Sequence, residues 1–157
     1  MATKTNAVRL VQQANIPCRE CFYEFDEKDL NGNHAATAIG MPSEQVFKTL
    51  VTLGDKTGIN VFCIPVCCEL DLKKAAKTTG DKRIDMVAVK DLLALTGYIR
   101  GGCSPVGMKK KYPTYFDETC ILWDEIAVSA GARGHQMIIP PLSLVSLLEA
   151  KLVDIIL

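Results

Sequence analysis

This sequence lacks the features that would place it in a membrane or outside the cell. No apolar run approaches the ~20 residues of a membrane span, and the first residues, MATKTNAVRL, lack the apolar core of a secretory signal. There is no excess of charge either, since 18 basic side chains balance 18 acidic ones. Proteins that bind nucleic acid tightly by themselves are normally basic. We therefore expect a cytoplasmic protein that has no membrane association and binds RNA weakly on its own.

Histidine is scarce, and the chain has only His34 and His135. A nucleophilic triad needs a histidine poised between a nucleophile and a carboxylate. His34 begins a predicted short helix and His135 alternates within a predicted strand, and neither has a catalytic motif around it. The sequence therefore gives little support to Ser-His or Cys-His catalysis.

Cysteine is abundant, with seven in the chain, but the pattern does not suit a metal site or a disulfide framework. The number is odd, and several cysteines lie inside apolar runs, as in 61–64. Cys18 and Cys21 have the spacing of a redox pair, yet they fall in a predicted strand, where residues three apart face opposite ways. We expect buried free thiols, no metal and no cofactor. A redox or metal-binding cysteine protein is the minor alternative.

Periodicity and capping residues predict an alternation of helices and strands. Asp71 and Asn33 are expected to cap helices, and glycine-containing turns at 54–58 and 130–134 are expected to join hairpins. The expected helices cover 5–15, 33–39, 71–77, 88–95 and 142–151. Besides the strand that contains Cys18 and Cys21, the expected strands cover 47–53, 59–66, 98–100, 126–129, 135–139 and 153–157. This order predicts one α+β domain over 1–157, with a mixed, largely antiparallel sheet or barrel-like core flanked by helices.

Lys48 is unusual because it lies inside an apolar strand, VFKTLV. Lysine is rarely buried without a partner. One interpretation is an edge-strand lysine that reaches solvent along its aliphatic stem. The other is a cation held over a pocket, where it fixes an anionic or carbonyl group of a ligand.

The segment RGGCSPVG, residues 100–107, combines glycines with a cysteine, a serine and a proline. The glycine pair permits positive φ and lets a ligand approach the backbone closely, so consecutive amides could point at a carbonyl oxygen. A tight turn between strands is the alternative. Cys103 has no histidine near it in sequence, and we interpret it as a small apolar residue.

Basic residues gather in one segment of this neutral chain. Lys73, Lys74 and Lys77 lie on one predicted helix, followed by Lys82 and Arg83. A solvated surface is one interpretation. A rim that contacts RNA phosphates weakly and in a salt-sensitive way is the other.

Taken together, these motifs resemble the YbaK/EbsC family of aminoacyl-tRNA deacylases over nearly the whole chain. The resemblance rests on six motifs that occur in order: IP at 16–17 followed by Tyr23, VFKTL at 46–50, LKKAAK at 72–77, TGY at 96–98, GG-x-SP-x-G at 101–107, and VS-x-G-x-RG at 128–134.

The resemblance implies a fold related to the editing domain of bacterial prolyl-tRNA synthetases and an activity that removes cysteine from mischarged proline tRNA. It implies two partners, prolyl-tRNA synthetase and the acceptor end of tRNA(Pro). Lys48 matches the functional lysine of the family, and the glycines of GG-x-SP fall on Gly101 and Gly102. The residues expected to bind substrate are Tyr23, Ser104, Pro105, Ser129 and Arg133.

With no persuasive protein nucleophile, we expect the substrate to supply one. The thiol of a cysteinyl ester is intrinsically nucleophilic, and the resemblance likewise implies thiol-assisted cyclisation. The amides of Gly101 and Gly102 would stabilise the oxyanion, while Lys48 orients the substrate. The alternatives are a deacylase for another mischarged tRNA, such as Ala-tRNA(Pro), and a non-catalytic module that binds tRNA or a synthetase.

Overall fold

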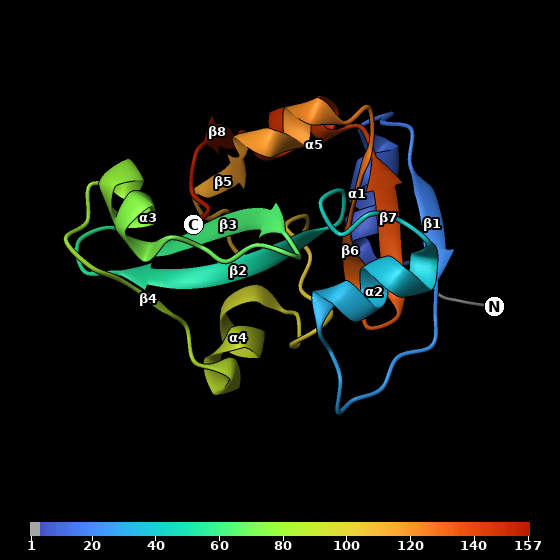
Figure 1. Cartoon of the computed structure of the whole chain (residues 1–157), viewed down its shortest axis with the longest axis horizontal. Helices are drawn as coiled ribbons and strands as arrows, with labels where there is room; N and C mark the ends of the chain where they lie inside the picture. The colour runs from blue at the N-terminus through green and yellow to red at the C-terminus, as the bar shows by residue number, and fades with distance from the viewer. Residues whose placement is uncertain (1–3) are drawn as a thin grey trace.

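A computed structural model describes residues 4–157 as an alternation of helices and strands (Figure 1). The helices are α1 (Asn6–Gln13), α2 (Gly32–Ile39), α3 (Leu72–Thr79), α4 (Val89–Thr96) and α5 (Pro141–Leu148), with a short 3-10 helix, η1, at Glu118–Leu122. The strands are β1 (Arg19–Phe22), β2 (Phe47–Gly54), β3 (Gly58–Pro65), β4 (Ile84–Met86), β5 (Thr114–Asp117), β6 (Ile126–Ala132), β7 (His135–Ile139) and β8 (Lys151–Val153).

The strands form two sheets that meet near the middle of the molecule. One sheet has the order β1-β7-β6 and is antiparallel, and the other has the order β4-β2-β3-β5-β8. In the second sheet β4, β2 and β3 are antiparallel, whereas β3, β5 and β8 are parallel. A parallel bridge between Val46 and Ala127 joins the two sheets. The predicted α+β fold with a mixed, largely antiparallel sheet is confirmed.

The β2–β3 hairpin separates two apolar clusters, because alternate residues of a strand face opposite sides. Val61 and Cys63 belong to the larger cluster, which α1 and α5 cover and which contains Phe47 and Phe116. The intervening Phe62 and Ile64 belong to the cluster beneath α3. The hairpin is therefore buried on both faces, which explains its almost continuous apolar sequence.

Local signals in the sequence located most helix ends correctly. Asp71 caps α3 by accepting from the backbone N–H groups of Lys73 and Lys74. Gly40, Gly80 and Gly97 end α2, α3 and α4 in the left-handed conformation, which glycine adopts at little cost. Both predicted hairpins are also present.

Several predicted elements were wrong. Residues 98 and 99 are irregular and Arg100 begins a turn, so this segment is not a strand. Asn31 caps α2 in place of Asn33. The last helix ends at Leu148, and the last strand covers Lys151–Val153 instead of 153–157. β4 and β5 were missed because they are short and are defined by pairing with distant strands.

None of the helices in residues 4–157 is both long enough and apolar enough to cross a membrane.

Candidate active site

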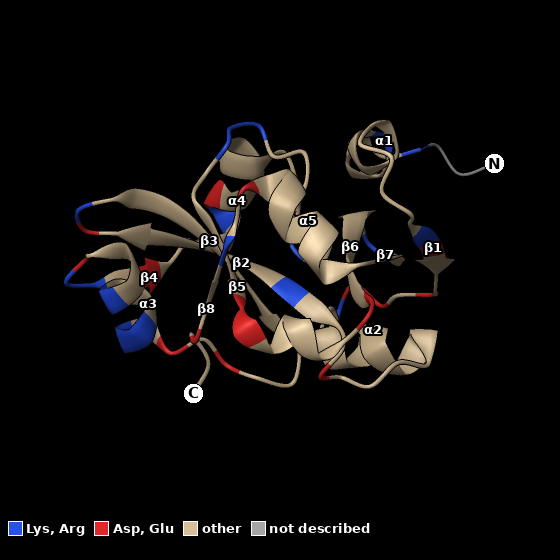
Figure 2. Ribbon diagram, turned by 90° about the horizontal axis from the view of Figure 1, so that it is seen from above, with Lys and Arg blue, Asp and Glu red and all other residues tan. Residues whose placement is uncertain are grey.

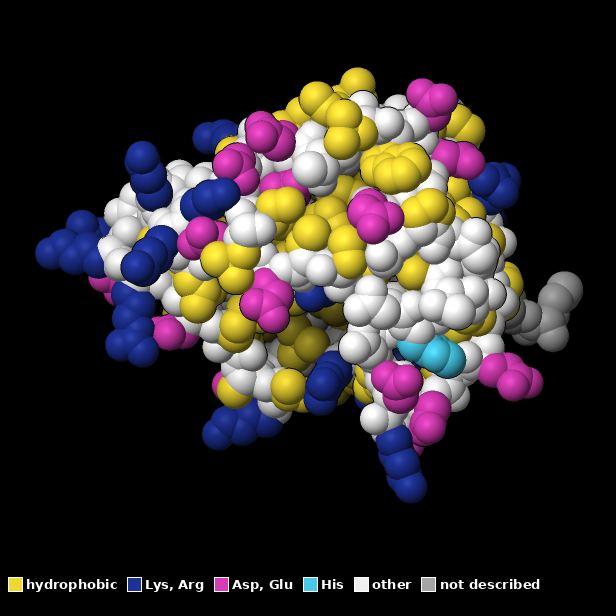
Figure 3. Space-filling view, in the orientation of Figure 1, with side chains coloured by type: hydrophobic (Ala, Val, Ile, Leu, Met, Phe, Trp, Pro, Cys, Tyr) yellow, Lys and Arg dark blue, Asp and Glu magenta, His cyan; other side chains and the backbone are white. Residues whose placement is uncertain are grey.

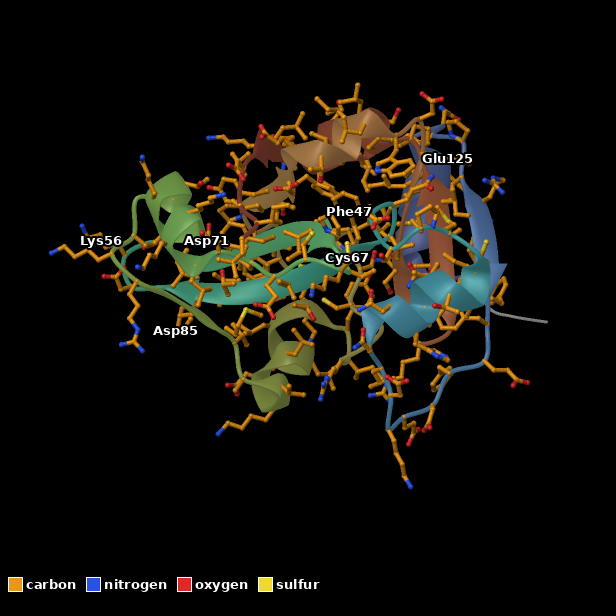
Figure 4. The ribbon with its side chains drawn as sticks, viewed as in Figure 1. Phe47, Lys56, Cys67, Asp71, Asp85 and Glu125 are labelled. Carbon is orange, nitrogen blue, oxygen red and sulfur yellow. The ribbon has the colours of Figure 1, made fainter. Side chains whose placement is uncertain are left out.

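A cavity of about 410 Å³ opens where the two sheets meet. Its walls come from β2, the residues before α2, the start of α4, the loop at 100–103, and the β6–β7 hairpin. Figure 3 shows this face of the molecule, with a hollow below its centre that apolar side chains border. Figure 4 places Phe47 and Cys67 near the middle of the molecule and Lys56 at the far end of the β2–β3 hairpin. The volume lies in the range of pockets that bind small molecules.

Strand pairing brings three polar side chains of the lining onto one surface. Val46 bridges to Ala127, so Lys48 and Ser129, each two residues further on, lie on the same faces as these partners. Gln136 stands directly opposite Ser129 in the β6–β7 ladder. Lys48, Ser129 and Gln136 therefore line the cavity from three strands.

Lys48 is half-buried and projects from β2 into this lining. It forms no ion pair with any carboxylate of residues 4–157, and no Asp or Glu lines the cavity. Arg100 is the second cation of the lining. The cavity therefore carries positive charge with no protein counter-charge in its wall, which favours an anionic or carbonyl-bearing ligand.

The glycine pair of the 100–107 segment performs two different structural tasks. Gly101 has φ +84°, and a Cβ there would lie 3.1 Å from Leu30 Cδ2. Gly102 has an ordinary φ, but a Cβ would lie 3.0 Å from the backbone of Ala132 and Arg133. Gly101 thus permits the turn, and Gly102 lets the loop pack against the β6–β7 hairpin.

The two amides of this pair are not equivalent, which corrects the prediction for Gly102. Its N–H donates to the carbonyl of Ile99 at 3.0 Å and is held inside the turn. No carbonyl of the described residues accepts from the Gly101 N–H, and Gly101 lines the cavity. Gly101 is therefore the amide that is available to a ligand oxygen.

The serine and proline of this segment lie outside the cavity, contrary to expectation. Ser104 is fully buried, and its Oγ accepts from the N–H of Val106 at 3.2 Å. Pro105 lines a separate cavity of about 280 Å³ beside Tyr112 and Leu147. Both residues shape the turn, and neither faces Lys48.

Cys103 does line the cavity, but its surroundings suppress nucleophilicity. It is 9% exposed, and burial raises its pKa to about 11, although Thr96 opposes part of that rise. Since the thiolate is the reactive form, Cys103 is a thiol in the wall, as expected from the sequence.

Tyr23 lies in the cavity wall, as expected from its motif. Its N–H donates to the carbonyl of Gly134 at 2.9 Å, which anchors the chain just after β1 to the β6–β7 turn. The ring meets His34 edge-on, with centroids 6.4 Å apart. His34 itself lies outside the main lining.

Ser129 and Arg133 have separate roles in the β6–β7 turn. Ser129 lines the cavity, and its Oγ accepts from the N–H of Gly131 at 3.2 Å. Arg133 does not line the cavity. Its Nε donates to the carbonyl of Arg100 at 2.9 Å, so Arg133 holds the glycine loop in place.

The predicted basic rim lies outside the cavity. Lys73, Lys74 and Lys77 lie on α3 (Figure 2), and none of the three lines the cavity. Lys74 is engaged, because its Nζ donates to Asp154 at 3.1 Å and to the carbonyl of Ile156 at 2.8 Å. It tethers the C-terminal segment, while Lys73 and Lys77 are exposed.

Gln136 was missed at the sequence level, and so was Arg100 as part of the lining. Gln136 interrupts the apolar strand HQMII, the same type of signal that drew attention to Lys48. Among residues 4–157 no group of three metal-binding side chains is placed to hold an ion.

Comparison with known proteins places these features among editing enzymes. Residues 33–147 match the family described as aminoacyl-tRNA editing domains. A protein of Enterococcus faecalis, EbsC, named as a candidate Cys-tRNA(Pro)/Cys-tRNA(Cys) deacylase, is 47% identical over 97% of this chain and 93% of its own. A proline–tRNA ligase of Shouchella clausii is 29% identical over 68% of this chain, which spans 18% of that protein. The crystal structure of a candidate trans-editing enzyme for prolyl-tRNA synthetase superimposes with a TM-score of 0.81 at 26% identity, covering 99% of both chains.

Proposed function

Since this chain belongs to the aminoacyl-tRNA editing domain family, we propose that it deacylates mischarged Cys-tRNA(Pro) released by prolyl-tRNA synthetase. The observation that carries the proposal is a cavity that presents an unpaired cation, Lys48, and a free amide, Gly101, without a protein nucleophile and base. The similarity to EbsC supports cysteine as the amino acid that is removed.

Among the residues that the structure describes, no histidine and no carboxylate lines the cavity to activate a nucleophile. Its thiol, Cys103, has a raised pKa, and Ser129 Oγ is used in the β6–β7 turn. The substrate thiol is therefore the nucleophile that the cavity has to orient. Intramolecular attack of this kind reaches effective molarities of ~10⁵ M or more.

In the proposed step the substrate sulfur bonds to the ester carbonyl carbon as the thiol proton passes to water. The carbonyl oxygen becomes an oxyanion, which accepts a hydrogen bond from the Gly101 N–H. The ester bond between the carbonyl carbon and the ribose oxygen then breaks. The ribose oxygen departs as part of the tRNA and becomes a hydroxyl by taking a proton from water. Water hydrolyses the resulting four-membered thiolactone to free cysteine.

Lys48 has a positioning task in this scheme. Its ammonium group is a compact cation with three donors, and it reaches the cavity from β2. We assign it to an oxygen of the terminal nucleotide or of the ester, which holds the carbonyl close to Gly101. The absence of a competing carboxylate in the wall leaves the cation available to substrate.

The proposal includes prolyl-tRNA synthetase as a partner. The chain has no net charge, and its exposed lysines on α3 lie away from the cavity, so electrostatic attraction to tRNA is weak. A synthetase that hands over its own mischarged product would supply the missing affinity and the selectivity for tRNA(Pro). The sequence similarity to part of a proline–tRNA ligase is consistent with a shared substrate.

The test compares deacylation of Cys-tRNA(Pro), Ser-tRNA(Pro) and Ala-tRNA(Pro), each with and without prolyl-tRNA synthetase. We expect rapid loss of cysteine, little loss of serine or alanine, and faster turnover with the synthetase. Equal turnover of the cysteinyl and seryl esters would exclude the substrate-thiol mechanism and indicate an activated water. Preferential loss of alanine would replace the proposed specificity.

A further inference from the structure

Gln136 combines burial with a lack of hydrogen bonding in the cavity wall. It is 6% exposed and lines the cavity, and its Oε1 has no hydrogen-bond partner among residues 4–157. Buried side-chain oxygens are nearly always hydrogen-bonded in folded proteins, because leaving one unpaired costs free energy. An unpaired amide in a ligand cavity therefore calls for a partner that arrives from outside the protein.

The strand register sets where this amide stands. Gln136 lies opposite Ser129 on β6 and opposite Cys21 on β1. Ala127, two residues before Ser129, bridges to Val46, two residues before Lys48, at the junction of the two sheets. Lys48 and Gln136 both line the cavity of about 410 Å³, a volume that accommodates an aminoacyl group.

The oxygens of two other polar side chains in the wall already accept from backbone N–H groups. Asn31 Oδ1 accepts from the N–H of Asn33 at 2.8 Å, and Ser129 Oγ accepts from the N–H of Gly131 at 3.2 Å. Lys48 and Arg100 have donors but no acceptor. The terminal torsion of glutamine is broad and roughly two-fold, so the Gln136 amide can turn its oxygen toward a ligand.

We infer that Gln136 binds the α-amino group of the aminoacyl ester through Oε1, an inference that rests on the proposed function. The two cations suit the oxygens of the ester and terminal nucleotide, but the amino group brings N–H donors and needs an acceptor. Gln136 supplies it. Holding the amino group at β7 and the ester oxygen near Lys48 fixes the rotation about the Cα–C bond, which points the thiol toward the carbonyl carbon.

The test measures the parent protein and one variant on two substrates, of which only one has the amino group. Gln136→Met keeps the length of the side chain and removes the acceptor, and 3-mercaptopropionyl-tRNA(Pro) keeps the thiol and ester but lacks the amino group. We expect Gln136→Met to lower kcat/KM for Cys-tRNA(Pro) by about 10- to 100-fold and to change it less than 2- to 3-fold for the mercaptopropionyl ester. Gln136→Glu, which restores an acceptor, should recover part of the activity on the cysteinyl ester alone.

Melting temperatures separate this role from a structural one. Because Gln136→Met removes an unpaired buried polar group, its Tm should equal or exceed that of the parent protein, and Gln136→Leu serves as a second apolar variant. Equal losses on the two substrates, or no loss on Cys-tRNA(Pro), would overturn the inference.

The inference and the proposed function fail in different ways. If the parent protein does not hydrolyse Cys-tRNA(Pro), the proposed function is wrong. Binding of 3′-(L-alanylamino)-3′-deoxyadenosine, measured against its propionylamino counterpart, then still tests Gln136. A preference for the amino-bearing compound that disappears in Gln136→Met supports the inference, and equal binding of the two compounds by the parent protein rejects it.

Discussion

Polar groups at the two ends of β2 differ in whether they have hydrogen-bond or ion-pair partners within the protein. At the Gly54 end, the buried carboxylate of Asp81 accepts from the N–H groups of Lys56 and Thr57 at 2.7 and 2.8 Å, and from the hydroxyls of Thr57 and Thr79 at 2.5 Å. Burial alone would raise the pKa of Asp81, but these hydrogen bonds hold it well below its usual range. The buried polar groups at this end therefore have hydrogen-bond partners within the protein.

At the Lys48 end, polar groups stand in the cavity without protein partners. Lys48 forms no ion pair, and Gln136 Oε1 has no donor, among residues 4–157. The two ends of β2 therefore differ in function. Hydrogen bonds at the Gly54 end stabilise the fold, whereas the polar groups at the Lys48 end are available to a ligand. Substitutions at the two ends should therefore separate stability from activity.

The largest effect on activity is expected from Lys48→Ala. If Lys48 holds the substrate during reaction, its loss should lower kcat/KM by about 10²- to 10³-fold. Tm should change little, because the Lys48 ammonium forms no ion pair with residues 4–157. Deacylation kinetics and thermal melts measure both quantities. Lys56→Ala, at the opposite end of the hairpin, is the matched control and should keep full activity. Parent-like kinetics for Lys48→Ala would make Lys48 an ordinary edge-strand lysine.

The reverse result is expected from Asp81→Ala. Removing the carboxylate leaves its four donors without a buried acceptor, so Tm should fall by roughly 5 °C or more. The folded fraction at low temperature should still deacylate at the parent rate, because Asp81 lies outside the cavity. A loss of kcat in fully folded Asp81→Ala protein would show that the two ends are coupled.

The lowered pKa of Asp81 leads to a prediction of how the free energy of unfolding depends on pH. Its folded-state pKa is lowered, so its contribution is fully present above the ordinary aspartate pKa of about 3.9 and is lost as pH falls from there toward the folded-state value. Denaturant unfolding between pH 6 and pH 3 should show this loss in the parent protein. In Asp81→Asn the free energy of unfolding should depend less on pH over the same range. If it falls as steeply as in the parent protein, Asp81 is not the group responsible.

Two glycines, Gly101 at the cavity and Gly58 at the turn of the β2–β3 hairpin, allow a further comparison. Gly101 and Gly58 both have positive φ, at +84° and +79°, but Gly101 faces Leu30 at the cavity whereas nothing lies within 4 Å of a Cβ at Gly58. Each Gly→Ala change should cost ~1–2 kcal/mol of stability from backbone strain. Only Gly101→Ala should also reduce kcat/KM, because Leu30 and the free amide must shift. Equal kinetics for both variants would remove Gly101 from the mechanism.

The smallest effect is expected from Cys103→Ala. With a thiol whose pKa is about 11, Cys103 contributes little thiolate near neutral pH, so kcat/KM should stay within ~3-fold of the parent value. Single-turnover deacylation measures this directly. An inactive but folded Cys103→Ala protein would instead indicate a covalent enzyme intermediate.

Features with a local physical cause could be predicted from the sequence. The Asp71 cap, the glycines that end α2, α3 and α4, and the two hairpin turns each depend on residues within a few positions of one another. Lys48 was also identifiable, because a lysine inside an apolar strand is conspicuous. The same signal was present at Gln136, but a neutral amide attracts less attention.

Features set by distant contacts could not be predicted. β5 pairs in parallel with β3 and β8. A short-range sequence pattern does not predict such distant strand partners. Ser104 and Pro105 share a motif with Gly101, yet the turn sends them to the other side of the loop.

The sequence alone therefore determined the α+β class, the family and the lysine of the site, since these depend on residue types and short spacings. The tertiary structure decided which amide of the glycine pair is free, left the lysines of α3 outside the cavity, and placed Gln136 in the same cavity as Lys48. Those outcomes depend on strand register and on the junction of two sheets, where one bridge between Val46 and Ala127 sets which side chains meet.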